Sequence, residues 1–381
     1  MGNHKQCAGK TVASINTRCR QVLDTVKAAI ALVKEYGGIL IVAGDFLDVV
    51  RPEAPVLAEV QKLLSEVDCF LLKGNHESVS AQKGDHSLAP LAPVCTIVEE
   101  PTIEIMAYKH DQKCAVFFVP FRPEAGVVYI ERDVKALTEQ WNTMCSEEGI
   151  KTHLPKVLVI HAGISDASTN SIMSGTREQI GVRDLARICS ENDILNVFAG
   201  NWHDRKTIVD STTGVVVHQI GALCPTGWNN PGLDLYGTVS RYTAPGHKPE
   251  DTIIPGPRFI QAASMEEALS LSSTYERPDL VYVKIVTDIE NYGKESAQLN
   301  ACIESGTICG GSCLLDKKDM DTKAIQAADN AREALTTENA LAEYVEEMPL
   351  KELPDGLNTE KYDEEFLREE IFHLCSNFMK G

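Results

Sequence analysis

The chain has 381 residues, enough for one large domain with a smaller addition or for two domains. Hydrophobic residues make up 43% of it and charged residues 24%, a balance that is typical of globular proteins and excludes collagen-like and disordered classes. The formal net charge of -19 opposes binding to a polyanion unless basic residues gather on one face.

The first part of the chain alternates predicted helices and strands. A helix is predicted over residues 14–36, where aliphatic residues recur at helical spacing and a Gly-Gly pair follows. The apolar run at 38–44 indicates a buried parallel strand that ends at Asp45. The unit then repeats, with a helix over about 54–66, a strand at 69–72 and a polar loop at 73–77.

Four further strands are predicted at 114–119, 156–160, 195–199 and 215–220. Strands separated by helices predict an α/β sandwich with mixed sheets flanked by helices. Ligands in such folds gather beyond the carboxyl ends of the strands. We therefore expect the polar loops after these strands to meet at one edge of one sheet.

Three domains are predicted. Residues 1–260 form the core, with a first strand that we expect to be truncated. Residues 261–322, with a helix near 264–271 and a strand at 280–286, form a small α/β domain. Residues 323–381 form an acidic helical tail, interrupted by prolines.

Short polar segments come after the predicted strands, and each carries oxygen or imidazole donors. Any one of them alone is ordinary turn chemistry, but an ordered set at successive strand ends is improbable by chance. The donors of this set are Asp45, Asn75, His76, His161, Asn201 and His203.

Donors of these types suit the hydrolysis of a phosphate ester. That reaction needs a deprotonated water and neutralised phosphate oxygens, and two divalent ions supply both. The short side chain of Asp45, at a strand end, suits a carboxylate that bridges two ions. No cysteine belongs to the set, which disfavours a structural zinc site and favours manganese, with iron and zinc as alternatives.

The segments resemble the calcineurin-like metallophosphoesterase superfamily, whose motifs are Asp-x-His, Gly-Asp-x-x-Asp, Gly-Asn-His-Asp/Glu, His and Gly-His-x-His. The resemblance spans residues 38–260. Within the superfamily, residues 221–232 and the Ile-Pro-Gly-Pro-Arg-Phe segment at 254–259 are similar to the SbcD-like branch of DNA repair exonucleases and its phage-encoded relatives.

The resemblance implies a role for each donor. Asp45 would bridge two metal ions, and His203 would join it on one of them. His76 would bind no metal and would protonate or stabilise the leaving oxygen. Asp48 would orient the loop or a ligand from behind. The ligands of the other ion would be Asn75, His161 and Asn201, beside Asp45.

The chain departs from the superfamily pattern at two motifs. Residues 200–203 read Gly-Asn-Trp-His, so that an asparagine, a weaker donor to transition metals, replaces a histidine. The first motif has no clean counterpart. Either His4 is its histidine and Gly2 stands in the aspartate position, or, as we prefer, the chain begins just after the motif. Both readings leave one metal position with Asp45 and His203 alone.

The function expected from the resemblance is that of a metal-dependent DNA nuclease of the repair-exonuclease type. The small domain would cap the site, the tail would dock a partner ATPase, and a homodimer is a further expectation. The alternatives are a phosphodiesterase or phosphatase for small nucleotides, and a catalytically impaired phosphoesterase fold that serves as a binding module.

Other features receive plainer interpretations. No apolar run approaches the roughly 18 residues of a membrane span, and the N-terminal residues lack the pattern of a signal peptide, so we expect a cytoplasmic protein with reduced thiols. Arg205 and Lys206 either clamp phosphate or end a solvated loop. Trp202 and Trp228 are expected to pack in the interior rather than stack on bases, and His218 to be structural or on the surface.

Overall fold

The computed structural model describes residues 9–47, 49–78, 84–109, 112–124, 126–148, 154–166, 179–225, 227–228 and 237–316, together with Val345 and Arg368. The chain divides into one unit formed by Met1–Thr287 and Tyr292–Leu314 and another formed by Asp288–Asn291 and Leu315–Gly381. The six-stranded sheet, the three-stranded sheet within residues 40–98 and the candidate site lie in the first unit.

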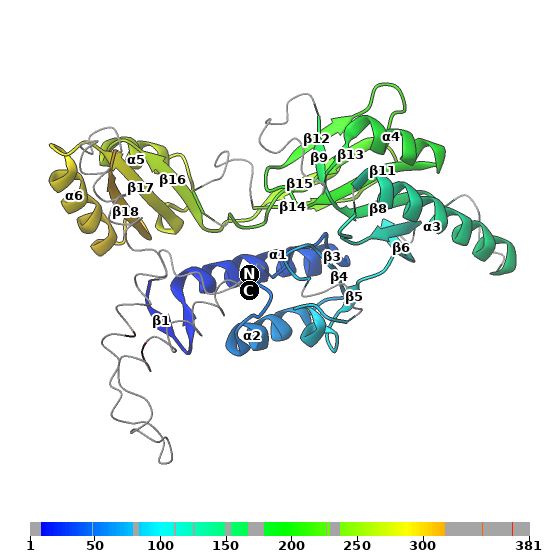
Figure 1. Ribbon diagram of the computed structural model, residues 1–381, viewed down its shortest axis with the longest axis horizontal. Coiled ribbons are helices and arrows are strands. Elements are labelled where there is room, and N and C mark those ends of the chain that lie inside the picture. Colours follow the sequence, from blue (N-terminus) through cyan, green and yellow to red (C-terminus); the bar gives the residue numbers. More distant parts are fainter. Residues whose placement is uncertain are drawn as a thin grey trace, which may run out of the picture. The chain divides into compact units, whose positions relative to one another are not determined.

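A three-stranded parallel sheet follows helix-forming residues 17–36 in the chain. Its strands, in spatial order, are β3 (Leu40–Val42), β4 (Cys69–Leu72) and β5 (Thr96–Val98). Helices α1 (Thr17–Tyr36) and α2 (Ala54–Leu64) pack on one face of it, and a hairpin of β1 (Thr11–Val12) and β2 (Ile15–Asn16) precedes α1 (Figure 1).

Helix α1 shows why these residues fold as they do. The side chain of Asn16 accepts a hydrogen bond from Cys19 N at 2.8 Å, which caps the helix and sets its start three residues after the predicted one. Gly37 ends the helix with φ +60°, a conformation that glycine adopts without steric cost. Between these ends, Leu23 and Ile30 turn into the core with α2 and β4.

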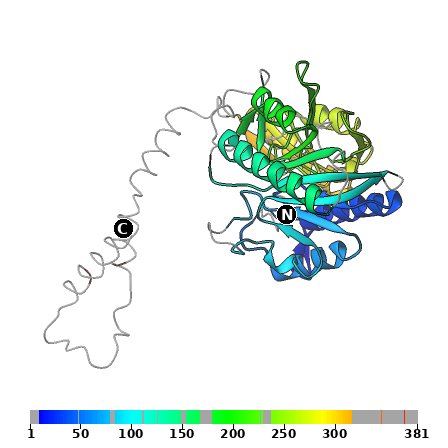
Figure 2. The ribbon, with the colours of Figure 1, turned by 90° about the vertical axis from the view of Figure 1, so that its right-hand side faces the viewer.

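The larger sheet has six strands. In spatial order they are β12 (Lys206–Val209), β13 (Val216–Gln219), β11 (Ile194–Gly200), β8 (Lys156–His161), β7 (Gln112–Val119) and β6 (Thr102–Lys109). The four inner strands are parallel, whereas β6 and β12 run antiparallel at the edges. Helices α3 (Gly126–Glu148) and α4 (Val182–Glu191) cover one face, and Figure 2 shows α3 laid along the strands.

The two sheets face each other across a shared apolar layer. On the side of the smaller sheet, Ala43 and Leu72 contribute to this layer. They pack against Val116, Phe118 and Val159 of the larger sheet. The layers are therefore helix, sheet, sheet and helix. This confirms the predicted α/β class, with a mixed and a parallel sheet flanked by helices.

The expectation that all the donor loops meet at an edge of one sheet was wrong, because they come after strands of two sheets. Asp45 and Asn75 follow β3 and β4 of the small sheet, whereas His161 and Asn201 belong to β8 and β11 of the large one. Both sheets are apolar on both faces, so each buries one face under helices and the other against its partner sheet. The carboxyl ends of both sheets then meet at one rim.

Smaller elements complete the first unit. Strands β9 (Gly163–Ser165) and β10 (Gln179–Gly181) are a parallel pair, and β14 (Thr238–Arg241) and β15 (Glu250–Ile253) are an antiparallel pair. Two 3-10 turns, η1 and η3, occupy Ala89–Leu91 and Pro278–Leu280.

A third sheet lies where the sequence predicts a small second domain. It orders β16 (Arg258–Ala262), β17 (Val281–Thr287) and β18 (Gly310–Leu315), with helices α5 (Met265–Ser272) and α6 (Tyr292–Glu304). Ile260, Met265, Val283 and Leu299 form a core of its own. The two predicted domain boundaries stay predictions, and the tail falls outside the described residues except for Val345 and Arg368.

Among the helices that the structure describes, none has the length and apolar composition of a membrane span.

Candidate metal centre

The predicted donors lie just beyond the strands that end at the rim between the two sheets. Asp45 stands three residues after β3, and Asn75 and His76 follow β4. His161 is the last residue of β8, and Asn201 comes directly after β11. Asp48 lies outside the described residues.

Three of the donors converge on one point. Nε2 of the His161 imidazole lies 2.9 Å from Asn75 Oδ1 and 3.2 Å from Asp45 Oδ2. The other ring nitrogen, Nδ1, lies 2.7 Å from the carbonyl oxygen of Ala43. A carbonyl oxygen only accepts, so Nδ1 carries a hydrogen and Nε2 faces the two oxygens. A proton on Nε2 satisfies these oxygens, and a metal ion in its place would be held by the same three atoms.

The pKa values of the two ionisable partners change in the directions that an Asp45–His161 ion pair produces. Complete burial opposes a charged His161, but the hydrogen bond and charge of Asp45 outweigh burial and raise the pKa of His161. Burial likewise opposes ionisation of Asp45, yet His161 and the amide of His76 outweigh it and lower the pKa of Asp45. The interior around these groups therefore accommodates a positive charge beside an ionised carboxylate.

Glu77 holds the two loops of the small sheet together. Its buried carboxylate accepts hydrogen bonds from Asp45 N at 3.1 Å, Leu47 N at 2.9 Å and Gly74 N at 2.8 Å. Burial and the charge of Asp45 raise the pKa of Glu77, while the amides of Leu47 and Gly74 oppose that shift. The sequence placed Glu77 within a motif but gave it no role, because only the fold brings these amides to its carboxylate.

The backbone of this rim adopts conformations that L residues rarely adopt. Gly44 has φ +90°, and a Cβ at this position would overlap the imidazole of His161. Asp45 and Asn201 have φ values of +54° and +95°, in the left-handed region that Asp and Asn tolerate better than most residues. Left-handed backbone at two loops of one rim is a recurrent feature of ligand sites.

Asn201 and His203 reach this rim through the register of the large sheet. Gly200 pairs with His161 across β11 and β8, and a Cβ on Gly200 would overlap the carbonyl oxygen of Ala43. Asn201, the next residue, therefore lies near the carbonyl group of Ala43, which orients the imidazole of His161. Trp202 is buried and His203 is exposed, so the histidine side chain faces solvent near the rim.

The donor set fits one metal ion well. Two ligands at right angles around an ion at about 2.1 Å lie about 3 Å apart, close to the 2.9 and 3.2 Å that separate His161 Nε2 from Asn75 and Asp45. No three His, Cys, Asp or Glu side chains cluster within the described residues, because asparagines supply part of this set. For the second ion, the predicted ligands remain Asp45 and His203, fewer than the three of a usual catalytic site.

His76 lies in the loop after β4, beside Asp45. Its backbone N donates to Asp45 Oδ1 at 3.1 Å, and its side chain is exposed. The loop is thus anchored through the main chain, and the imidazole is left at the surface of the rim.

The structure also decides the features that the sequence left open. The guanidinium of Arg205 pairs with Asp251, and the ammonium of Lys206 lies 3.1 Å from Asp166, so both cations are engaged within the chain. Buried Trp202 lies directly over Gly163, where a Cβ would overlap its ring.

Trp228 packs against a neighbouring aromatic ring. Its ring lies edge-on to Phe259 at 5.2 Å, and its Nε1 donates to Ile260 O at 3.1 Å. The expected interior packing is confirmed for Trp202, whereas Trp228 is half-buried and packs against Phe259.

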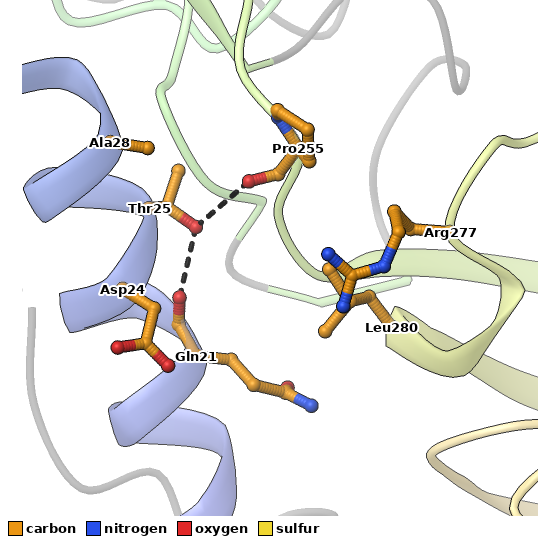
Figure 3. Close-up of a pocket in the computed structure, with 7 residues that line it drawn as sticks. All are labelled: Gln21, Asp24, Thr25, Ala28, Pro255, Arg277 and Leu280. Carbon is orange, nitrogen blue, oxygen red and sulfur yellow. Dashed lines mark hydrogen bonds between the residues drawn. The ribbon is translucent and has the colours of Figure 1, made fainter. Parts of the chain in front are cut away.

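A cavity of about 260 Å³ lies apart from these donors, between α1 and the segments around β15 and η3 (Figure 3). The hydroxyl of Thr25 on its wall donates to Gln21 O at 2.9 Å and lies 3.4 Å from Pro255 O. None of the predicted site residues lines this cavity, whose walls are formed by Gln21, Asp24, Thr25, Ala28, Pro255, Arg277 and Leu280.

Known proteins offer distant likenesses. No family model matches the chain, and no curated protein matches it by sequence. Similar solved structures include the protein TT1561 of Thermus thermophilus, with 17% identity, coverage of 53% of this chain and 84% of that one, and a TM-score of 0.34.

Two others are named as enzymes. The purple acid phosphatase PPD1 of yellow lupin (Lupinus luteus) seeds has 12% identity, coverage of 56% and 43%, and a TM-score of 0.34. A putative 5'-nucleotidase of Staphylococcus aureus has 14% identity, coverage of 52% and 42%, and a TM-score of 0.32. The chain thus spans less than half the length of these two. Scores of this size do not establish a shared fold, so any function proposed for the chain rests on its own side chains.

Proposed function

We propose that the chain is a metal-dependent phosphoesterase that hydrolyses phosphodiester bonds, with DNA as its substrate. The observation that carries this proposal is the convergence of Asp45, Asn75 and His161, in which Nε2 of a buried histidine faces two oxygens. A divalent cation, when bound there, lowers the pKa of a water ligand and neutralises phosphate oxygens.

The chain's own residues then have separate tasks. Asp45 and Asn75 offer oxygens and His161 a nitrogen to the cation, while Glu77 holds the loop amides in place. The exposed imidazole of His76, in its protonated form, would give its proton to the departing sugar oxygen. Asn201 and His203 would complete the ligand set from the large sheet.

The direct test measures metal binding and turnover on the same protein. The chain should bind Mn²⁺ and hydrolyse bis(p-nitrophenyl) phosphate. Changing His76→Ala should lower kcat by about 10²–10⁴ with Mn²⁺ affinity unchanged, because a general acid contributes about that factor. His247→Ala, which removes another exposed histidine, is the matched control and should retain turnover. Absence of Mn²⁺ binding, or full activity in the His76→Ala variant, would contradict the proposal.

A second candidate is a phosphodiesterase for small nucleotides, which the net charge of -19 favours, because a small substrate does not require an extended basic surface. It uses the same centre and differs only in what binds beside it. The salt dependence of turnover separates the two candidates, because only a DNA substrate would be held through several backbone phosphates.

A further inference from the structure

The loop after β11 is tied to the fold at successive residues. The carbonyl oxygen of His203 accepts a hydrogen bond from Ala222 N at 2.9 Å. The carbonyl oxygen of Asp204 accepts from Gln219 Nε2 at 2.6 Å. The side chain of His203 is exposed, so packing does not hold it. Its position depends on the main chain of the loop, which the hydrogen bonds of His203 and Asp204 and the ion pair of Arg205 fix.

Arg205 supplies the anchor that involves charge. Its guanidinium pairs with Asp251 Oδ2, and the two side chains are 25% and 21% exposed, so water screens the pair only in part. The second oxygen of Asp251, Oδ1, accepts from Ser240 Oγ at 2.7 Å. Both oxygens of the carboxylate are therefore used, and β15 is connected to the loop that carries His203.

The same chain of hydrogen bonds continues into the large sheet. Ser240 gives its hydroxyl hydrogen to Asp251, so its oxygen accepts from His218 Nε2 at 2.8 Å. His218 Nδ1 then accepts from the hydroxyl of Thr207 at 2.7 Å. Because Nε2 already carries a hydrogen, His218 cannot take a proton from Ser240, and the trio is no serine nucleophile. The network instead holds β12, β13, β14 and β15 together.

We propose that Asp251 is a positioning residue of the candidate metal centre, acting through Arg205 to fix the loop in which His203 stands. The inference rests on the proposed function, since His203 is a metal ligand only there. Groups that orient a metal ligand from behind typically change metal affinity by about 10- to 100-fold when they are removed.

The test compares two variants of the same hairpin in the full-length chain. Asp251→Asn removes the charge that holds Arg205 and keeps the shape of the side chain. Glu250→Gln is the matched control. Glu250 pairs with Arg241 between β15 and β14, and this ion pair is more exposed to solvent than that of Asp251. Arg205→Met removes the same ion pair from its other side and serves if the Asp251 variant fails to fold.

Two readouts are needed. The first is amide hydrogen exchange of residues 201–208 without metal, which we expect Asp251→Asn to accelerate at least about tenfold, as for a loop that has lost a charged anchor. The second is the affinity for Mn²⁺, followed by its EPR signal, which we expect to fall about tenfold. Glu250→Gln should change neither by more than about twofold.

The outcomes separate the two proposals. Faster exchange together with weaker Mn²⁺ binding supports the positioning role. Unchanged exchange and affinity in both Asp251→Asn and Arg205→Met overturn it and leave the proposed function intact, because the wild-type chain still binds Mn²⁺. A wild-type chain that binds no Mn²⁺ overturns the proposed function, and the positioning role with it.

Discussion

At the scale of single residues, the candidate centre depends on which nitrogen of His161 carries its hydrogen. The carbonyl oxygen of Ala43 binds Nδ1–H, and this leaves Nε2 to face Asp45 and Asn75. The main-chain oxygen of a residue that follows β3, in the other sheet, thus orients a side chain 118 residues away in the sequence. Glu77 likewise fixes Asp45, because its carboxylate accepts a hydrogen bond from the backbone N–H of Asp45.

The role of Glu77 can be tested by removing its charge. In Glu77→Gln, an amide NH₂ replaces one carboxylate oxygen and meets backbone N–H groups that can only donate. We expect the free energy of unfolding to fall by about 1–3 kcal/mol, the effect of leaving a buried donor unsatisfied. Urea denaturation measures the change.

The matched control for this change is Glu66→Gln. Glu66 accepts from Lys34 at 3.0 Å on the surface, with both side chains more than 40% exposed, so its loss should change stability by less than about 1 kcal/mol. Equal effects of the two substitutions would show that Glu77 does not organise the loops.

At the scale of elements, hydrogen bonds of the buried His218 side chain connect β13 to the strands β12 and β14. His218 is fully buried in β13, and it contacts Thr207 of β12 and Ser240 of β14. Burial lowers its pKa to about 4, which the nearby charge of Asp251 opposes and that of Arg205 reinforces. At neutral pH His218 is uncharged, so its 3.6 Å approach to Asp251 is not an ion pair.

This depressed pKa predicts a pH dependence of stability. The unfolded chain protonates His218 near pH 6.5, whereas the folded chain does so near pH 4. Between these values the unfolded state binds more protons, so stability falls as the pH falls. A shift of this size lowers the free energy of unfolding by about 2 kcal/mol between pH 7 and pH 5.

A comparison with His218→Gln isolates the effect of this one group. All other groups titrate alike in both proteins, so the stability advantage of the wild type should shrink by about 2 kcal/mol from pH 7 to pH 5. Urea denaturation at both pH values supplies the difference. An advantage that stays constant would mean that His218 titrates normally in the fold.

At the scale of the whole molecule, the net charge of -19 bears on the choice of substrate. Two cations near the rim, Arg205 and Lys206, are neutralised by Asp251 and Asp166 and so offer little attraction to a DNA backbone. Without these two cations as partners, we expect a DNA substrate to make few phosphate contacts at the rim.

Salt dependence tests this expectation. If DNA is the substrate, kcat/KM for cleavage should fall at least about tenfold between 50 and 200 mM salt, the loss that two phosphate contacts produce. Hydrolysis of bis(p-nitrophenyl) phosphate under the same conditions is the control and should barely change. Turnover of small nucleotides with no cleavage of DNA would favour the second candidate.

Local pattern was sufficient for many single elements of this fold. Helix α1 was predicted from its apolar stripe and glycine stop, and β8 and β11 from their apolar runs, all within three residues of the observed bounds. Helix α3 and the edge strand β6 were missed. The charged residues along α3 obscure its apolar stripe, and β6 is partly exposed, so its apolar pattern is weak.

The sequence by itself determined the α/β class and the residue types available for a metal site, because helical and strand periodicity and the order of polar loops are local properties. Only the tertiary structure decided that two sheets share the rim, that Nε2 of His161 meets Asp45 and Asn75, and that Asp251 reaches Arg205. These contacts join residues 46 to 116 positions apart, and their geometry depends on how the layers pack.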